Sequence, residues 1–245
     1  MRIKAFLYIF VVTVLLAASA LAAVPTDLNK EFLTGKVKSI DEDTATMKLK
    51  KGVLVEDSRY RSRSISFDRQ GRMTYKWQKI DKLSPNEYFY TYEGDDKRFT
   101  RSVFINLFGV DAKKNPDRIS LTILRYDADK NEIFEDVYAE RESYVDALTQ
   151  KYTYTFDKEN RLVEDILAGS NGIPAFLTRY VYGTERLPTE RRGYIVGNPI
   201  PAISKYVYEL DSTGNWTKQT AETTLAKKDA EATTVITYRK ISYYK

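Results

Sequence analysis

The residues of this sequence that are equipped for chemistry are carboxylates, lysines, arginines and hydroxyl-bearing side chains, because its 245 residues include no histidine and no cysteine. Without imidazole or thiol there is no Ser–His or Cys–His nucleophile and no thiolate or imidazole metal site. We therefore predict that the protein is not an enzyme and holds no cofactor. A hydrolase that uses carboxylates ranks third among the possible functions of this protein. The best pair of carboxylates for such a reaction is Asp95 and Asp96. These two residues are adjacent in a predicted turn, so their carboxylates would not face each other across a cleft.

One stretch has the spacing of a metal loop. Asp127, Asp129 and Asn131 stand where the first ligands of a calcium loop would stand. The sixth position is Glu132, where the sharp turn needs glycine, and the twelfth is Tyr138, where a bidentate glutamate belongs. A hairpin turn is the simpler interpretation, so we predict no metal site.

Two groups of residues are candidate binding residues. Arg59, Arg61 and Arg63 alternate along one predicted strand, so their guanidinium groups would share a face and hold an anionic polymer or phosphate groups. The alternative is a solvated, charged strand face. Trp77 and Trp216 follow predicted turns, which places them near the rim of the sheet. The alternative is that they belong to the core.

Tyrosines recur at a spacing of two. A stripe of this period usually marks the buried face of a sheet. A surface on which sugars or peptides stack is the alternative. The stripe comprises Tyr88, Tyr90 and Tyr92, then Tyr152 and Tyr154, then Tyr180 and Tyr182, and finally Tyr206 and Tyr208.

The elements that carry these residues are predicted to be β-hairpins. Tyr206–Leu210 alternates, Asp211 and Gly214 supply a turn, and a return strand follows. Weaker copies of the turn begin at positions 68, 93, 127, 157 and 183, about 30 residues apart, which suits a two-stranded repeat. The segment 234–244 is predicted to be a terminal strand that pairs with the strand bearing Trp216. Asp136–Gln150 is predicted to hold one or two helical turns.

These repeats resemble a known family. Tyr206-x-Tyr208-x-x-Asp211-x-x-Gly214-Asn215, with looser copies at Tyr152-x-Tyr154-x-Phe156-Asp157-x-x-Asn160 and Phe67-Asp68-x-x-Gly71, is similar to the YD repeat of Rhs- and teneurin-type proteins. The C-terminal pattern and residues 33–40 resemble exported, largely uncharacterised proteins of Bacteroidetes-type bacteria. The resemblance implies a β-hairpin sheet and export, and it implies no activity, because the repeat is structural in the proteins where it is understood.

The N-terminus has the pattern of a signal peptide. Arg2 and Lys4 precede an apolar run from Ala5 to Leu16, and small residues follow. We predict that residues 1–23 are removed and that residues 24–245 form a single hairpin-repeat domain without a transmembrane segment. An uncleaved anchor is the alternative. The full chain carries a net charge of +5, and this mixed surface is not typical of nucleic-acid binding.

These observations predict an all-β fold of sequential hairpins in a strongly twisted or curled antiparallel sheet, as a half-barrel or incomplete barrel. The function they favour is a non-enzymatic binding or structural module in the cell envelope, periplasmic or at the cell surface, with an envelope protein, a glycan or a lipid as partner. The alternative is a periplasmic carrier that holds an apolar ligand in the curled sheet. The two differ in whether the concave face is filled by its own Tyr and Phe or leaves an apolar cavity.

Overall fold

The computed structural model describes residues 25–79, 85–94, 98–107, 117–141, 144–227 and 231–245. The predicted signal peptide and the pair Asp95 and Asp96 lie outside them. The described chain contains one short helix, α1 (Asp27–Lys30), and fourteen strands. These are β1 (Val37–Lys50), β2 (Val53–Phe67), β3 (Met73–Gln78), β4 (Asn86–Gly94), β5 (Arg98–Leu107), β6 (Asp117–Asp127), β7 (Glu132–Arg141), β8 (Tyr144–Phe156), β9 (Leu162–Gly169), β10 (Pro174–Tyr182), β11 (Pro188–Ile195), β12 (Ala202–Leu210), β13 (Trp216–Leu225) and β14 (Thr233–Tyr243).

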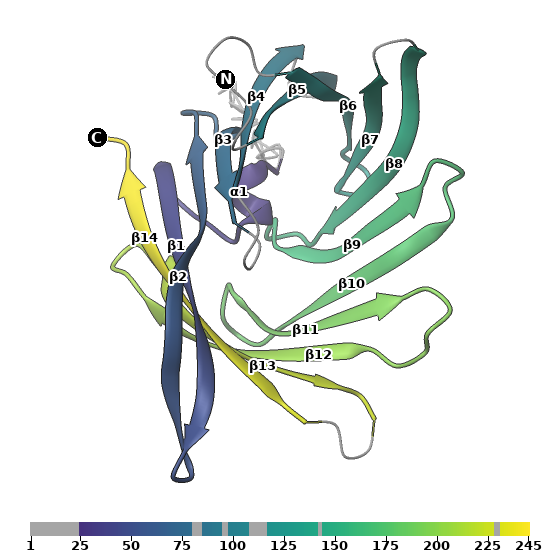
Figure 1. Ribbon diagram of the computed structural model, residues 1–245. Helices are drawn as coiled ribbons and strands as arrows, with labels where there is room; N and C mark the ends of the chain where they lie inside the picture. The colour runs from purple at the N-terminus through teal and green to yellow at the C-terminus, as the bar shows by residue number, and fades with distance from the viewer. Residues whose placement is uncertain (1–24, 80–84, 95–97, 108–116, 142–143, 228–230) are drawn as a thin grey trace, which may run out of the picture.

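The strands form one closed antiparallel ring (Figure 1). Each strand pairs with its neighbours in sequence, and β14 pairs with both β13 and β1. The predicted all-β fold of sequential hairpins in a curled sheet is confirmed, as is the pairing of the terminal strand with the strand bearing Trp216. The pairing extends beyond the half-barrel or incomplete barrel that we expected, because the seam between β1 and β14 completes the ring.

The repeated turns gather at one end of this barrel, because neighbouring strands alternate in direction. Three of them share one geometry. In each, an aspartate Oδ1 accepts hydrogen bonds from the backbone N–H groups two and four residues later, at 2.9 to 3.0 Å. In each turn, the residue three positions after the aspartate has positive φ: Gly71 at 80°, Asn160 at 56° and Gly214 at 83°. Glycine and asparagine tolerate this conformation best, which explains the repeat pattern of the sequence.

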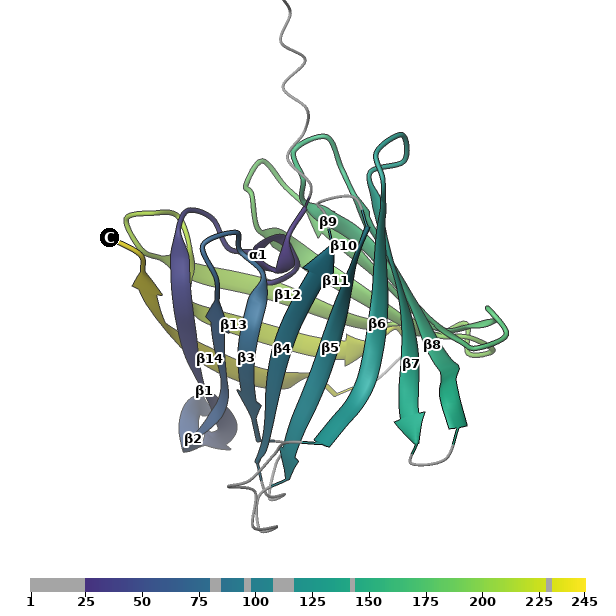
Figure 2. The ribbon, with the colours of Figure 1, turned by 90° about the horizontal axis from the view of Figure 1, so that it is seen from above.

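The same end of the barrel is closed from inside by residues 25–36, which we call the N-terminal plug. Figure 1 shows α1 within the ring of strands, and Figure 2 shows it close to one end of them. Leu33 of the plug is 2% exposed and packs with Val37, Ile40, Ile65 and Phe67. A cluster of buried apolar residues therefore lies where the plug meets β1 and β2.

The prediction of helical turns within residues 136–150 is wrong. Within this segment, residues 136–141 belong to β7 and residues 144–150 belong to β8, so neither stretch forms helical turns. The reason is tertiary pairing, which overrides weak local helical preference: β7 pairs with β6 and β8 with β9. In the described part of the chain, no helix has the length and apolar character needed to cross a membrane.

Candidate functional site

The N-terminal plug is held by the repeated turns. The side-chain amide of Asn215, a fully buried residue, donates to the carbonyl of Thr34 at 2.9 Å, and its oxygen accepts from the N–H of Thr34 at 2.7 Å. The N–H of Leu28 donates to the carbonyl of Gly71 at 3.3 Å, and Asn29 donates to the carbonyl of Asn160 at 3.3 Å. These contacts satisfy plug backbone groups, so the turns form a seat for the plug.

Buried charges fix one side of the plug to the seam. We call Glu31, Glu42, Arg63 and Arg239 the seam cluster. Arg63 binds Glu31 through both terminal nitrogens, at 2.9 and 2.7 Å, and donates to Glu42 at 2.8 and 2.9 Å. Arg239 donates to Glu42 at 2.9 and 2.6 Å, and its guanidinium lies 3.5 Å from the ring centroid of Trp216. The cluster holds two positive and two negative groups, so it is balanced.

The electrostatics of the seam cluster follow from this pairing. Burial by itself would raise the pKa of Glu42. The charges of Arg239 and Arg63 and their hydrogen bonds outweigh burial and lower that pKa to about 2. Glu42 therefore stays ionised in the folded protein well below neutral pH.

A second set of charges joins the plug to β5 and β7. We call Asp27, Lys30, Arg101 and Glu135 the floor cluster. Arg101 donates to Glu135 at 2.9 Å, and Lys30 also pairs with Glu135. Both cations lie within 4 Å of Asp27, at 3.7 Å from Lys30 and 3.8 Å from Arg101. Burial favours a higher pKa for Glu135, but Arg101 and Lys30 lower it to about 2. This cluster is also balanced.

Above the floor cluster lies a cavity of about 500 Å³, which we call the chamber. Its floor includes Asp27 and Lys30 of the plug, and Gln150 lines it and is exposed, so the chamber reaches solvent. Five partly buried tyrosines form much of its wall: Tyr88, Tyr90, Tyr152, Tyr154 and Tyr180. The rings of Tyr152 and Tyr154 are nearly parallel, with centroids 6.1 Å apart. The volume is in the range of cavities that bind small molecules.

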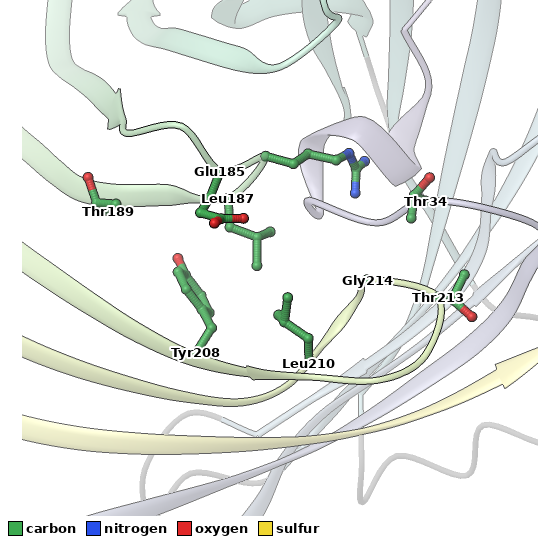
Figure 3. A pocket seen from close by; sticks show the side chains of 9 residues that line it. Thr34, Glu185, Leu187, Thr189, Tyr208, Leu210, Thr213 and Gly214 are labelled. Carbon is green, nitrogen blue, oxygen red and sulfur yellow. The ribbon is translucent and has the colours of Figure 1, made fainter.

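A second pocket of about 490 Å³ lies at the plug end, between two of the turns (Figure 3). Two of its larger polar side chains already bond to backbone carbonyls. Arg186 donates to the carbonyl of Leu33, and the hydroxyl of Tyr208 donates to the carbonyl of Pro188 at 2.9 Å. The chamber is therefore the stronger candidate site. The lining residues of this second pocket are Thr34, Glu185, Arg186, Leu187, Thr189, Tyr208, Leu210, Thr213 and Gly214.

The structure does not place the three predicted arginines on one face. Arg63 turns to the seam cluster, whereas Arg61 donates to Asp41 at 2.5 Å and Arg59 to Asp43 at 3.3 Å, both in exposed pairs. The physical reason is a register shift between β1 and β2. Arg63 and Arg61 pair with consecutive residues of β1, so the residue between them is extra and changes the alternation.

Of the two tryptophans, Trp216 fits the alternative of a core position. Trp216 is 4% exposed beneath Arg239, so it belongs to the core and is not open to a ligand. Trp77 is partly buried, with the guanidinium of Arg61 5.1 Å from its ring centroid. None of the five predicted binding residues, all of which the structure describes, lines the chamber.

The calcium-loop spacing marks a hairpin turn. The carboxylate of Asp127 accepts from the N–H groups of Asp129 and Lys130, at 3.1 and 3.3 Å, and Asn131 has a φ of 53°. The Asn131 side chain accepts from Tyr126 at 2.8 Å. Within the described ranges, no three acidic side chains are grouped so that they could hold a metal ion.

Sequence reasoning missed both charge clusters and the chamber, although one signal was present. Several charged residues of the clusters occupy positions of a strand whose neighbours two residues away are apolar. Glu135 lies between Ile133 and Val137, and Arg239 alternates with Ile241. A charge at an inward position of a strand is costly to bury alone, so such a position predicts a partner inside the barrel.

The sequence matches no protein-family model and no curated protein. Three solved structures illustrate its likenesses. A porin-like protein from Bacteroides vulgatus ATCC 8482 is 13% identical, with a TM-score of 0.41, over 85% of this chain and 98% of the other. A porin-like protein from Bacteroides uniformis ATCC 8492 is 11% identical, with a TM-score of 0.38, over 84% and 98%. A protein of unknown function from Bacteroides fragilis NCTC 9343 is 16% identical, with a TM-score of 0.29, over 56% and 87%. Values this low carry no functional argument.

Proposed function

We propose that this protein is an exported, non-enzymatic binding module of the cell envelope that holds a small polar ligand in the chamber. The observation that carries the proposal is the chamber itself, a cavity of about 500 Å³ that opens to solvent and is lined by tyrosines and charged groups. Tyrosines offer large, rigid surfaces for stacking and hydroxyls for hydrogen bonds. Export rests on the signal-peptide pattern of residues 1–23.

The character of the chamber wall disfavours the alternative of a carrier for an apolar ligand. Charged side chains line the chamber from several strands and from the plug. An apolar ligand would strip water from these groups without replacing their hydrogen bonds, which is costly. The charged lining residues are Asp27, Lys30, Glu31, Lys76, Arg101, Glu135 and Asp165.

Exposed charges on the part of the barrel formed by β9, β10 and β11 support a protein that works in water. Arg179 and Glu164 form an exposed ion pair at 2.8 Å, and Arg192 and Glu190 form another at 2.5 Å. Strand faces that contact hydrocarbon need apolar side chains instead. We therefore infer that ligands enter the chamber from an aqueous compartment.

The test compares the full chain with two variants that differ at the mouth of the chamber. Gln150→Trp narrows the opening, whereas Thr149→Trp adds the same ring to the neighbouring exposed residue, which does not line the chamber. After purification without refolding, mass spectrometry measures small molecules released from each protein. We expect a released ligand from the wild type and from Thr149→Trp, and a reduced amount from Gln150→Trp. Equal amounts from all three, or none from any, would count against the chamber as the site.

A further inference from the structure

Lys76, a partly buried residue, differs from the cations of the seam and floor clusters. It lies on β3, opposite Tyr88 of β4, and lines the chamber. Its ammonium is 5.8 Å from the ring centroid of Tyr88. No carboxylate of the described residues lies within ion-pair distance of it. Burial lowers the pKa of Lys76 and the charge of Arg63 lowers it further, which the opposite charges of Glu31 and Glu42 offset only in part.

The charge balance around the chamber makes this position informative. Lys30 and Arg101 are neutralised by Asp27 and Glu135 in the floor cluster. The two arginines of the seam cluster are likewise matched by its two glutamates. The charges within each cluster therefore cancel. Within the described part of the chain, Lys76 remains as a positive charge without an ion-pair partner on its side of the chamber. A buried ammonium is costly unless a negative group accompanies it.

A hydroxyl donor lines the same chamber as this ammonium. Tyr90 follows Tyr88 by two residues on β4, so both side chains point into the chamber. Among the described residues, the Tyr90 hydroxyl has no hydrogen-bond partner. It is therefore free to donate to an oxygen of a ligand held near Lys76.

The far wall has the opposite character. Asp165 of β9 lines the chamber and accepts a hydrogen bond from the Tyr180 hydroxyl at 2.9 Å, without an ion-pair partner among the described residues. Burial raises the pKa of this carboxyl. A negative group on the ligand is repelled by an ionised Asp165 and attracted by Lys76. The two walls therefore orient an asymmetric ligand.

We infer, on the basis of the proposed binding function, that the ligand of the chamber carries a carboxylate or phosphate group, which Lys76 and the Tyr90 hydroxyl receive while the rest of the molecule stacks on the tyrosines. A lysine ammonium binds either group as a point charge. The chemistry shared by both groups is a compact anion with several acceptor oxygens.

The experiment uses three probes with the same ring. Benzoate carries a carboxylate, phenyl phosphate carries a phosphate, and benzamide is the neutral counterpart of benzoate. Titration calorimetry of the full chain measures the affinity of each. We expect benzoate or phenyl phosphate to bind at least about tenfold more tightly than benzamide, since a charge-assisted hydrogen bond is worth that much. The stronger of the two anions identifies the group.

Lys76→Met removes the charge and leaves an unbranched side chain that is one atom shorter, and Lys205→Met makes the same change at an exposed lysine of β12. We expect Lys76→Met to weaken binding of the anion about tenfold or more and to leave benzamide unchanged. We expect no change in Lys205→Met. Melting curves establish that both variants fold.

The outcomes separate the two proposals. If benzamide binds as tightly as the anions, or if Lys76→Met binds the anions as the wild type does, the chamber binds ligands but the inference about the anion is wrong. If none of the probes binds and no ligand is released from the purified protein, the binding function itself is overturned.

Discussion

The seam cluster and the chamber wall around Lys76 both place charge inside the barrel, but they treat it differently. In the seam cluster, each guanidinium and each carboxylate has an opposite charge within hydrogen-bond distance. On the chamber wall, the Lys76 ammonium faces open volume and a tyrosine ring. The contrast teaches that buried charge alone does not identify a functional site. A cluster in which every charge has an opposite partner stabilises the fold. A charge that lacks such a partner and lies beside a cavity can bind an oppositely charged group of a ligand.

The strongest test of this contrast removes Arg239. Arg239→Met leaves Glu42 buried with only part of its neutralising charge, and breaking a buried pair costs about 3–5 kcal/mol. Urea unfolding measures the loss in the free energy of unfolding. The matched control is Arg192→Met, which breaks an exposed pair worth about 0–1 kcal/mol. Similar losses in the two variants would show that the seam cluster does not stabilise the fold.

Acid should weaken the clusters in a defined pH range. The pKa of Glu42 and that of Glu135 are about 2 in the folded protein, against an ordinary value of 4.5. Because the folded-state value is the lower one, the stabilisation is complete above pH 5 and is lost as the pH falls toward 2. We expect each carboxylate to cost about 2 kcal/mol of stability between pH 6 and pH 3. Urea unfolding across this range measures it, and stability unchanged down to pH 3 would contradict the pairing. Glu42→Gln should flatten the dependence.

The seat of the plug can be tested at two equivalent turn positions. Gly71 and Gly214 have nearly the same positive φ, but an added Cβ at Gly71 would lie 2.9 Å from plug atoms of Leu28 and Thr26, whereas one at Gly214 meets nothing within 4 Å. Alanine in this conformation costs about 1–2 kcal/mol at either position. We expect Gly71→Ala to lose about 1 kcal/mol more than Gly214→Ala, because the plug must shift as well.

The control for this pair is Gly169→Ala, since Gly169 does not have positive φ. Its effect on the free energy of unfolding should be the smallest of the three. Gly214→Ala as stable as the wild type would show that the turn does not require its glycine. Equal losses for Gly71→Ala and Gly214→Ala would show that the plug does not rest on the turn.

The smallest effect is expected at the chamber wall. Lys76→Met should change the free energy of unfolding by no more than about 0.5 kcal/mol, or increase it, because no partner is left uncompensated. Lys205→Met, at an exposed site, should behave alike. A loss at Lys76 as large as that of Arg239→Met would mean that this ammonium stabilises the fold, and the contrast between the two regions would disappear.

The parts of this fold that the sequence predicts are those determined locally. Asp211 and Gly214 specify their turn through contacts a few residues apart, and the alternation before them specifies a strand. The closure of the sheet into a ring was not predictable from such local contacts. It depends on pairs such as Val37 and Tyr243, which are far apart in sequence and carry no pattern of their own. The resemblance to the YD repeat stays a prediction.

The candidate site was harder to predict for the same reason. Glu31, Glu42 and Arg239 meet only after the barrel has closed, so their spacing in the sequence carries no information on their contact. The register shift at Arg61 and Arg63 is also invisible to a rule of strict alternation. The tyrosine stripe indicated the inner face correctly. Whether that face is filled or hollow depends on how many strands surround it, which is a property of the whole ring.

The seam between β1 and β14 also bears on how the chain folds. Thirteen strand pairings of the barrel join consecutive strands and form as local hairpins. The pairing of β1 with β14 instead joins the two ends of the sheet. Pairing over such a separation is slow, because the loop must close before any contact rewards it. During synthesis, β1 would therefore wait with an unpaired edge until β14 emerges, and such edges are open to pairing with other chains. We expect pulse-labelling hydrogen exchange during refolding to show the amides that pair β1 with β14 protected last, with Glu42 meeting Arg239 in that final step.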